Sequence, residues 1–104
     1  MKPVSFDQSV YAMAALIPMG KVSTYGAIAK AIGSPRAARA VGNALGANTD
    51  TRAVPCHRVV RGDGSIGGYS GGEGPATKAK LLMREGVKVS AGRVALDNYL
   101  FADF

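Results

Sequence analysis

The sequence predicts one mainly α-helical domain with short β-hairpins, spanning residues 1–104, with a winged-helix-like helix-turn-helix fold. Two observations favour this fold class, and a third indicates a polyanionic partner. Apolar residues recur at helical spacing in three segments of the first half of the chain. Gly-Ser-Pro at residues 33–35 separates two of these segments, as the turn of a helix-turn-helix does. Lysine and arginine number 13 against 7 acidic residues, which leaves a net charge of +6.

Three helices are expected in this half, over residues 6–17, 25–32 and 35–45. Thr24 is the expected N-cap of the second helix, because its hydroxyl can accept a hydrogen bond from the first turn. Gly33 would stop that helix. Ser34 and Pro35 would then start the third helix, with serine as its N-cap and proline at its first position.

The second half of the chain is expected to contain short strands and one more helix. The expected elements are a buried strand over 54–60, a turn at 61–64, a return strand over 65–69, a helix from Pro75 closed by Gly86, and a hairpin over 87–96. The sequence Ser-Gly-Gly-Glu-Gly at residues 70–74 is typical of a loop.

Composition and charge exclude several classes of protein. No apolar run approaches the roughly 20 residues of a membrane span, and the first residues lack the apolar core of a signal peptide. A single cysteine allows no internal disulfide and no cysteine-based metal site, which fits a reducing compartment. We therefore expect a cytoplasmic, nucleoid-associated monomer with no metal and no membrane partner. Its pI of about 9.8 favours a polyanionic partner.

The apolar run at residues 54–60 places the only cysteine, Cys56, beside the only histidine, His57. A free thiol of pKa about 8.5 is only a few per cent thiolate at neutral pH, so a nucleophilic cysteine needs an activating neighbour. Adjacency alone favours two structural residues, because neighbours on a strand point to opposite faces. His57 would therefore have to act through a water or around a bend near Pro55.

The third predicted helix has an unusual composition for a helix that reads the major groove. Such a helix normally presents several Arg, Asn or Gln side chains to base edges. Here Arg39 is the one long polar side chain within residues 37–44. A smooth surface with one cation suits a narrow groove and insertion into the base stack. The alternative is that the small residues serve tight helix packing.

Glu85 is expected in the last turn of its helix, where a carboxylate opposes the helix dipole by about 0.3–1 kcal/mol. Two interpretations stay open at this point. Glu85 is either an exposed, tolerated charge or the group that orients His57, as the third member of a Cys-His-acid chain.

Three motifs together resemble the C-terminal domain of the O6-alkylguanine-DNA alkyltransferases. They are Pro55-Cys56-His57-Arg58-Val59, the preceding Ser34-Pro35-Arg36-Ala37-Ala38-Arg39-Ala40-Val41-Gly42, and the following Tyr69-Ser70-Gly71-Gly72. The resemblance runs from about Phe6 to Val87, without the additional N-terminal domain common in that family. It implies direct reversal of damage in double-stranded DNA. By this resemblance, an O6-alkylated guanine would be flipped out through the minor groove, and its alkyl group would be transferred irreversibly to the cysteine.

The resemblance also implies a role for individual residues, and no cofactor. Cys56 would be the alkyl acceptor and His57 the water-mediated base. Glu85, which matches the family's Leu-Leu-x-x-Glu-Gly motif, would hold His57. Arg39 would fill the gap left by the flipped base, and Tyr25 would help rotate the nucleotide and donate a hydrogen bond to the guanine.

The remaining site residues are assigned by the same resemblance. Asn48 matches the family's hinge asparagine, which ties the helix-turn-helix to the active-site strand. The further residues expected at the DNA are Ser34, Arg36, Ala37, Ala38 and Gly42. Those expected to shape the lesion pocket are Val59, Tyr69, Ser70 and Lys78.

Two other functions stay open. The alkyltransferase-like proteins resemble this chain in shortness, bind O6-alkylguanine and recruit nucleotide excision repair proteins without transferring anything. Trp or Ala typically replaces their cysteine, so the presence of Cys56 favours the enzyme. A plain helix-turn-helix regulator would need several base-reading side chains, which the alanine-rich helix does not supply.

Overall fold

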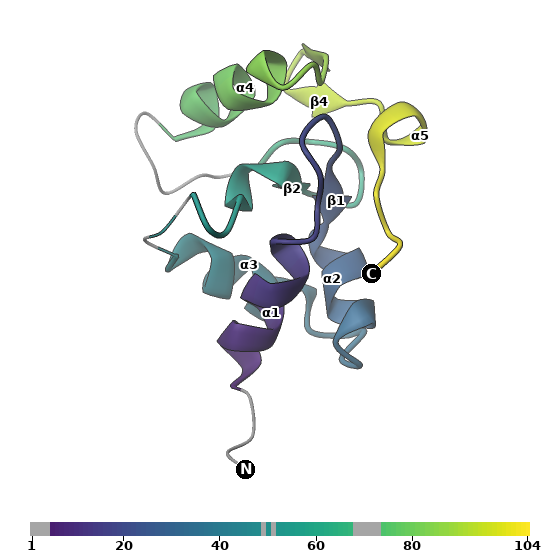
Figure 1. Ribbon diagram of the computed structural model, residues 1–104. Helices are drawn as coiled ribbons and strands as arrows, with labels where there is room; N and C mark the ends of the chain where they lie inside the picture. The colour runs from purple at the N-terminus through teal and green to yellow at the C-terminus, as the bar shows by residue number, and fades with distance from the viewer. Residues whose placement is uncertain (1–4, 49, 51, 68–73) are drawn as a thin grey trace.

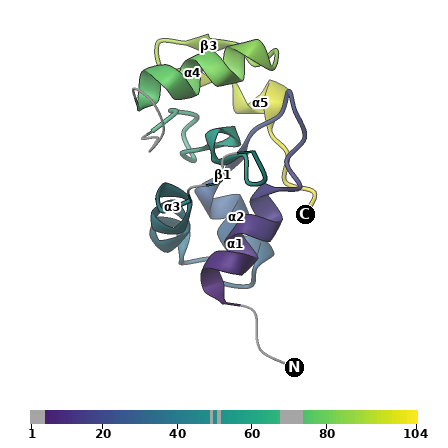
Figure 2. The ribbon, with the colours of Figure 1, turned by 60° about the vertical axis from the view of Figure 1, so that its left-hand side comes forward.

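The computed structural model describes residues 5–48, 50, 52–67 and 74–104. In chain order its elements are α1 (Phe6–Ala14), β1 (Ser23–Thr24), α2 (Tyr25–Ala31), α3 (Ala38–Gly46), the 3₁₀ helix η1 (Cys56–Arg58), β2 (Val59–Val60), α4 (Pro75–Arg84), β3 (Val89–Ser90), β4 (Arg93–Val94) and α5 (Leu96–Tyr99). The helices α1, α2 and α3 lie on one side of β1 and β2, and α4 with the β3–β4 hairpin lies on the other (Figure 1, Figure 2). The predicted mainly α-helical fold with short strands is confirmed. None of the helices in the described residues is long and apolar enough to cross a membrane.

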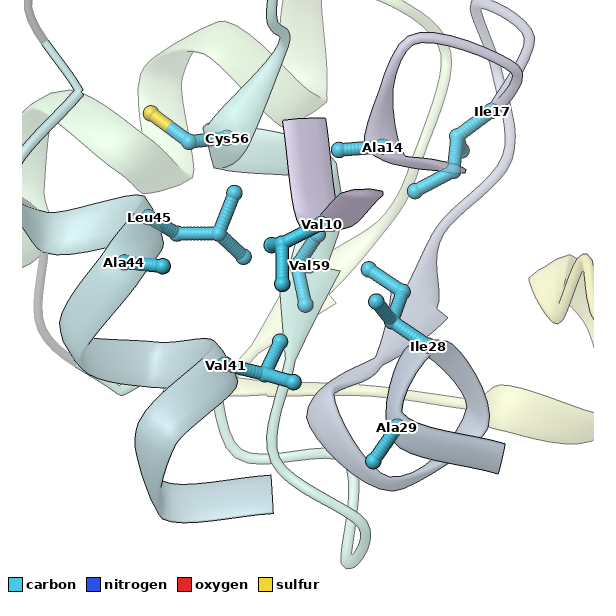
Figure 3. Close-up of a cluster of buried hydrophobic side chains, with 10 residues drawn as sticks. All are labelled: Val10, Ala14, Ile17, Ile28, Ala29, Val41, Ala44, Leu45, Cys56 and Val59. Atoms are coloured by element: carbon cyan, nitrogen blue, oxygen red, sulfur yellow. The ribbon is translucent and has the colours of Figure 1, made fainter. Parts of the chain in front are cut away.

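The helices α1, α2 and α3 pack around one cluster of buried apolar side chains (Figure 3). Its members are Val10, Ala14, Ile17, Ile28, Ala29, Val41, Ala44, Leu45, Cys56 and Val59. A capping box starts α1: Ser5 Oγ accepts a hydrogen bond from Gln8 N, and Gln8 Oε1 accepts one from Ser5 N. The Tyr11 hydroxyl donates a 2.7 Å hydrogen bond to the Ala44 carbonyl, which ties α1 to the last turns of α3.

The helices α2 and α3 form the predicted helix-turn-helix. As expected, Thr24 caps α2, because its side-chain oxygen accepts a 3.0 Å hydrogen bond from Ala27 N. Gly33 follows α2 with φ +79°, a left-handed conformation that glycine adopts without steric cost. The expected N-cap and stop signals of α2 are therefore both confirmed.

The predicted start of α3 is wrong by three residues. Ser34 and Pro35 lie in a turn, closed by a 2.9 Å hydrogen bond from Ala37 N to the Ser34 carbonyl. The helix itself begins at Ala38 and has no side-chain cap. The Ser-Pro signal marks a chain reversal here, because serine and proline are also common in the first positions of a type I turn.

The segment around the cysteine is a 3₁₀ turn, so the strand predicted over residues 54–60 is wrong except at its end. Pro55 has no N–H to give to a ladder, and its carbonyl accepts a 2.9 Å hydrogen bond from Arg58 N. Only Val59 and Val60 are extended, and they pair in parallel with β1. Val59 belongs to the first core and Val60 to the second, as alternation along a strand requires.

The second core lies between β2, α4 and the hairpin. It consists of Val22, Val60, Ile66, Leu82, Val87 and Val94. The predicted hairpin of β3 and β4 is confirmed, and Gly86 follows α4 at φ +88° as expected. The predicted return strand does not pair with β2 in the described residues. Ser65 instead forms an antiparallel bridge with Arg93 of β4, because β2 already pairs with β1 and the turn carries the chain to the hairpin.

The C-terminal segment returns to the middle of the molecule and lies against β1. Val22 N donates a 2.9 Å hydrogen bond to the Tyr99 carbonyl, and Phe101 N donates a 2.7 Å hydrogen bond to the Val22 carbonyl. The rings of Phe101 and Phe104 meet edge to face at 5.3 Å and pack against the first core. This segment therefore braces the strand that leads into α2.

Candidate active site

The single turn of η1 carries the candidate nucleophile and base between the two layers. Cys56 is 5% exposed at the edge of the first core, and its sulfur points away from the aliphatic side chains (Figure 3). His57 is 7% exposed. Because a 3₁₀ helix has three residues per turn, neighbouring side chains diverge by about 120° and not by the half-turn of a strand. The bend near Pro55 that the sequence required is present.

The structure brings His57 and Glu85 together. His57 Nε2 lies 3.1 Å from Glu85 Oε2, and both side chains are largely buried. The two atoms are within ion-pair distance, but their geometry does not meet that of a hydrogen bond. Nδ1 is buried and has no hydrogen-bond partner among the described residues. One ring nitrogen thus faces the carboxylate, and the other is available for proton transfer.

Burial and neighbouring charges set the protonation of this pair. Burial lowers the pKa of His57, and the adjacent Glu85 carboxylate only partly opposes it, so the pKa lies below 6.5. Burial acts to raise the pKa of Glu85, but the hydrogen bonds from Arg58 and the nearby His57 outweigh it, and the pKa lies below 4.5. A neutral imidazole therefore faces an ionised carboxylate at neutral pH, which is the combination that a general base needs.

Lys78 on α4 is buried beside the same turn. Its Nζ donates a 2.6 Å hydrogen bond to the Val59 carbonyl and one at 3.5 Å to the Tyr25 hydroxyl oxygen. Burial lowers the pKa of Lys78 to about 8. The neighbouring Cys56 acts to raise this pKa, and the charge of Arg61 acts to lower it further. Burial also raises the pKa of Tyr25, so its hydroxyl keeps its proton. The fold thus brings together Tyr25, Cys56, Val59 and Lys78 from four separate elements.

Asn48 lies just after the end of α3, at the start of the segment that leads to Cys56. Its Nδ2 donates a 3.1 Å hydrogen bond to the Val54 carbonyl and a 3.3 Å one to the Asp50 carbonyl. Its Oδ1 accepts a 3.1 Å hydrogen bond from Asp50 N. The side chain therefore joins the end of the helix-turn-helix to the residues just before Pro55, in the position that the sequence assigned to a hinge asparagine.

The residues expected at the DNA lie in the turn before α3 and on its first turns. Arg36 and Arg39 are exposed, and Ser34, Ala37, Ala38 and Gly42 are partly buried. A methyl group added at Gly42 would lie 3.7 Å from the Tyr25 ring. Gly42 therefore lies at the contact between α3 and the start of α2, next to a side chain already placed at the active site.

Two predicted pocket residues, Tyr69 and Ser70, lie outside the described residues, and their roles stay predictions. The structure adds Arg58, which the sequence did not single out, and its guanidinium contacts both carboxylate oxygens of Glu85. The available signal was a cation inside an apolar run, directly after the candidate base. In the described part of the chain, no three His, Cys, Asp or Glu side chains gather closely enough to hold a metal ion.

Comparison with known proteins matches most of the chain to the family that its motifs resemble. Residues 5–87 match the family described as 6-O-methylguanine DNA methyltransferase, DNA binding domain. The bifunctional methyltransferase/endonuclease of Picrophilus torridus is 39% identical over 104 residues, all of this chain and 34% of that protein. The methylated-DNA–protein-cysteine methyltransferase of Mus musculus is 45% identical over 80 residues, 77% of this chain and 37% of that protein. The chain thus spans about a third of the length of these relatives.

A solved structure extends the match to nearly the whole fold. S. pombe Atl1, in complex with damaged DNA containing O6-carboxymethylguanine, superposes with a TM-score of 0.85 at 34% identity. The superposition covers 97% of this chain and 98% of that one. The helix-turn-helix architecture therefore rests on sequence and structure alike. This chain belongs to the DNA-binding-domain family of the 6-O-methylguanine DNA methyltransferases.

Proposed function

We propose that this chain reverses DNA damage by transferring the alkyl group of O6-alkylguanine, in double-stranded DNA, irreversibly to Cys56. The observation that carries the proposal is the buried arrangement of Cys56, His57 and Glu85, with His57 Nε2 3.1 Å from Glu85 Oε2. A lone thiol beside a neutral imidazole that faces a carboxylate is the arrangement expected of an activated nucleophile. The name of the mouse relative, a protein-cysteine methyltransferase, supports the same chemistry.

The reaction needs a thiolate and a proton for the departing base. His57 takes the proton of Cys56 through one water, at the ring nitrogen that does not face Glu85, and the carboxylate stabilises the resulting imidazolium. The bond from Sγ to the alkyl carbon forms as the bond from that carbon to O6 breaks. The electron pair goes to the guanine, which receives the proton from His57. The products are a thioether and an intact guanine, so each protein molecule reacts once.

The lesion has to leave the duplex to reach this cysteine, because an O6 atom inside the base stack cannot contact a buried thiol. Arg39 projects from the exposed face of α3 and fills the gap from the minor groove. Tyr25 helps to rotate the nucleotide and donates a hydrogen bond to the guanine. The net charge of +6 supports binding to the phosphates, so affinity falls as salt rises.

One observation favours a second function. The similarity to S. pombe Atl1 covers nearly the full length of both chains, and that structure holds O6-carboxymethylguanine in DNA. A protein of this second kind binds the lesion and recruits nucleotide excision repair proteins without alkyl transfer. The two functions use the same DNA surface and differ in what happens at Cys56.

The mass of the intact protein separates the two functions. The chain and its Cys56→Ser variant are each incubated with a duplex that contains one O6-methylguanine. Alkyl transfer adds one methylene to the wild-type chain, mapped to Cys56 by peptide analysis, and leaves the variant unchanged. Tight binding to the lesion with no change in mass would support the second function and refute the proposed transfer. Neither binding preference nor mass change would overturn both.

A further inference from the structure

Arg58, the last residue of η1, uses all three nitrogens of its guanidinium. Nε donates a 2.9 Å hydrogen bond to Glu85 Oε1, and Nη2 donates a 2.7 Å hydrogen bond to Glu85 Oε2. The Arg58 and Glu85 side chains are 15% and 12% exposed. A planar two-point contact of this kind fixes the orientation of the carboxylate as well as its charge, which lysine cannot do.

This contact bears directly on the candidate base. Glu85 Oε2 lies between the Arg58 guanidinium and His57 Nε2, at 2.7 Å and 3.1 Å. Because Arg58 also holds Oε1, the carboxylate cannot turn away from His57 without breaking a hydrogen bond. Glu85 is the C-cap of α4, where the helix dipole disfavours a negative charge. Arg58 offsets that disadvantage.

The third nitrogen connects the pair to the helical body. Arg58 Nη1 donates a 2.9 Å hydrogen bond to the carbonyl of Ile17, which follows α1. The same loop packs against the end of α4, where a methyl group added at Gly20 would lie 3.3 Å from the Glu85 carbonyl. Arg58 therefore holds η1, the end of α4 and the segment after α1 in one arrangement.

We propose that Arg58 is a positioning residue for the alkyl transfer, which holds Glu85 so that His57 carries its proton on Nε2 and offers Nδ1 as the base. The catalytic meaning of this inference rests on the proposed function. The arrangement itself is a property of the chain without DNA, and it is measured there first.

The charges that face His57 make the inference specific. They are Glu85 at the end of α4, Arg58 in η1, and Lys78 on α4. Glu85 favours the protonated imidazole, and the two cations oppose protonation. Loss of the Arg58 charge should therefore raise the pKa of His57, and loss of the two-point contact should let the carboxylate move. A residue that acted only through its charge would change the pKa but leave the tautomer as it is, so the tautomer is the readout that tests positioning.

The single histidine makes both quantities measurable by NMR. The Hε1 proton of His57 gives one titrating signal, and the ring nitrogen shifts report the tautomer. Three variants are compared with the wild type: Arg58→Met, which removes the charge; Arg58→Lys, which keeps the charge but not the two-point contact; and Arg84→Met, an exposed control beside Glu85. We expect the Nε2–H tautomer in the wild type and in Arg84→Met. Arg58→Met should show a raised pKa and a mixture of tautomers.

Arg58→Lys should bring the pKa back towards that of the wild type and leave the tautomers mixed. A folded Arg58→Met with the tautomer of the wild type would overturn the inference, whatever its pKa. If Arg58→Met does not fold, the tautomer in Arg58→Lys decides, and a wild-type ratio there overturns it in the same way.

The rate of transfer gives the second test, with the O6-methylguanine duplex in single turnover. Arg58→Met should lose about 10- to 100-fold in rate, part of the 10²–10⁴ that a positioned acid–base group contributes. The acid limb of its pH–rate profile should move to higher pH, while its affinity for the duplex stays within about twofold of the wild type. If the wild type transfers nothing, the proposed function is refuted. The NMR measurement still tests whether Arg58 fixes the tautomer of His57, because it does not depend on transfer. Equal rates in the wild type and Arg58→Met refute this inference alone.

Discussion

Lys78 Nζ lies 2.6 Å from the Val59 carbonyl oxygen, to which it donates a hydrogen bond, and the lysine is 1% exposed. The contact joins α4 to β2, three residues after the cysteine. It places a nearly buried cation beside the site, and burial lowers the pKa of Lys78 to about 8. A group whose pKa falls on folding makes stability depend on pH between its folded and unfolded values.

The first prediction concerns this pH window. From about pH 8 to about pH 10, the folded chain releases the Lys78 proton while the unfolded chain still holds it, so stability rises with pH. The free energy of unfolding of the wild type should rise by about 2 kcal/mol relative to Lys78→Met across this window. Urea unfolding at several pH values measures it, with Lys80→Met, an exposed lysine on the same helix, as the control that follows the wild type. Parallel curves for wild type and Lys78→Met would contradict the lowered pKa.

The second prediction concerns the tie from Asn48 to Val54. Asn48→Ala removes the donor to the Val54 carbonyl and should lower the free energy of unfolding by about 1 kcal/mol, the typical value of one hydrogen bond. Because Val54 immediately precedes Pro55 and Cys56, the transfer rate should fall as well. Asn48→Asp keeps the acceptor for Asp50 N but not the donor, so its transfer rate should resemble that of the alanine variant. Chemical denaturation and mass-detected transfer measure the two effects. A rate equal to that of the wild type in both variants would remove the hinge role.

The third prediction separates base flipping from chemistry. Arg39→Ala should slow transfer from a duplex by about 100-fold, because the flipped state loses the side chain that offsets an unstacking cost of a few kcal/mol. Transfer from the free base O6-methylguanine needs no flipping and should keep the wild-type rate. Arg93→Ala, an exposed arginine in β4 outside the helix-turn-helix, is the matched control. Equal losses on the duplex and on the free base would show that Arg39 acts on the site itself.

The fourth prediction concerns the C-terminal segment. Phe101 packs on the first core, meets the ring of Phe104, and follows the residue bridged to Val22. Phe101→Ala should lower the free energy of unfolding by about 2 kcal/mol, less than for a fully buried phenylalanine because Phe101 is only partly buried. Thermal and urea unfolding provide the measurement. Asp103→Ala, an exposed change in the same segment, should leave stability as it is. Comparable losses in the two variants would mean that the segment responds to any substitution.

Local sequence patterns predicted most of the helical framework. Apolar spacing marked α1, α2 and α3, Thr24 capped α2 as expected, and Pro75 and Gly86 bounded α4. These features depend on groups within four residues of one another, so the sequence carries them directly. The start of α3 was misplaced, because Ser34 and Pro35 suit a turn as well as a helix start.

The sequence by itself also determined which residues are candidates for thiol chemistry. One cysteine and one histidine left a single candidate pair, and the motifs around that pair resembled one family. Only the tertiary structure decided how that pair is arranged. Cys56 lies in a 3₁₀ turn, and Glu85 faces His57 while bound to an arginine 27 residues away in sequence. Such contacts depend on how the two layers pack on either side of β1 and β2. Local preferences do not encode that packing, because the free energy comes from burial shared among distant segments.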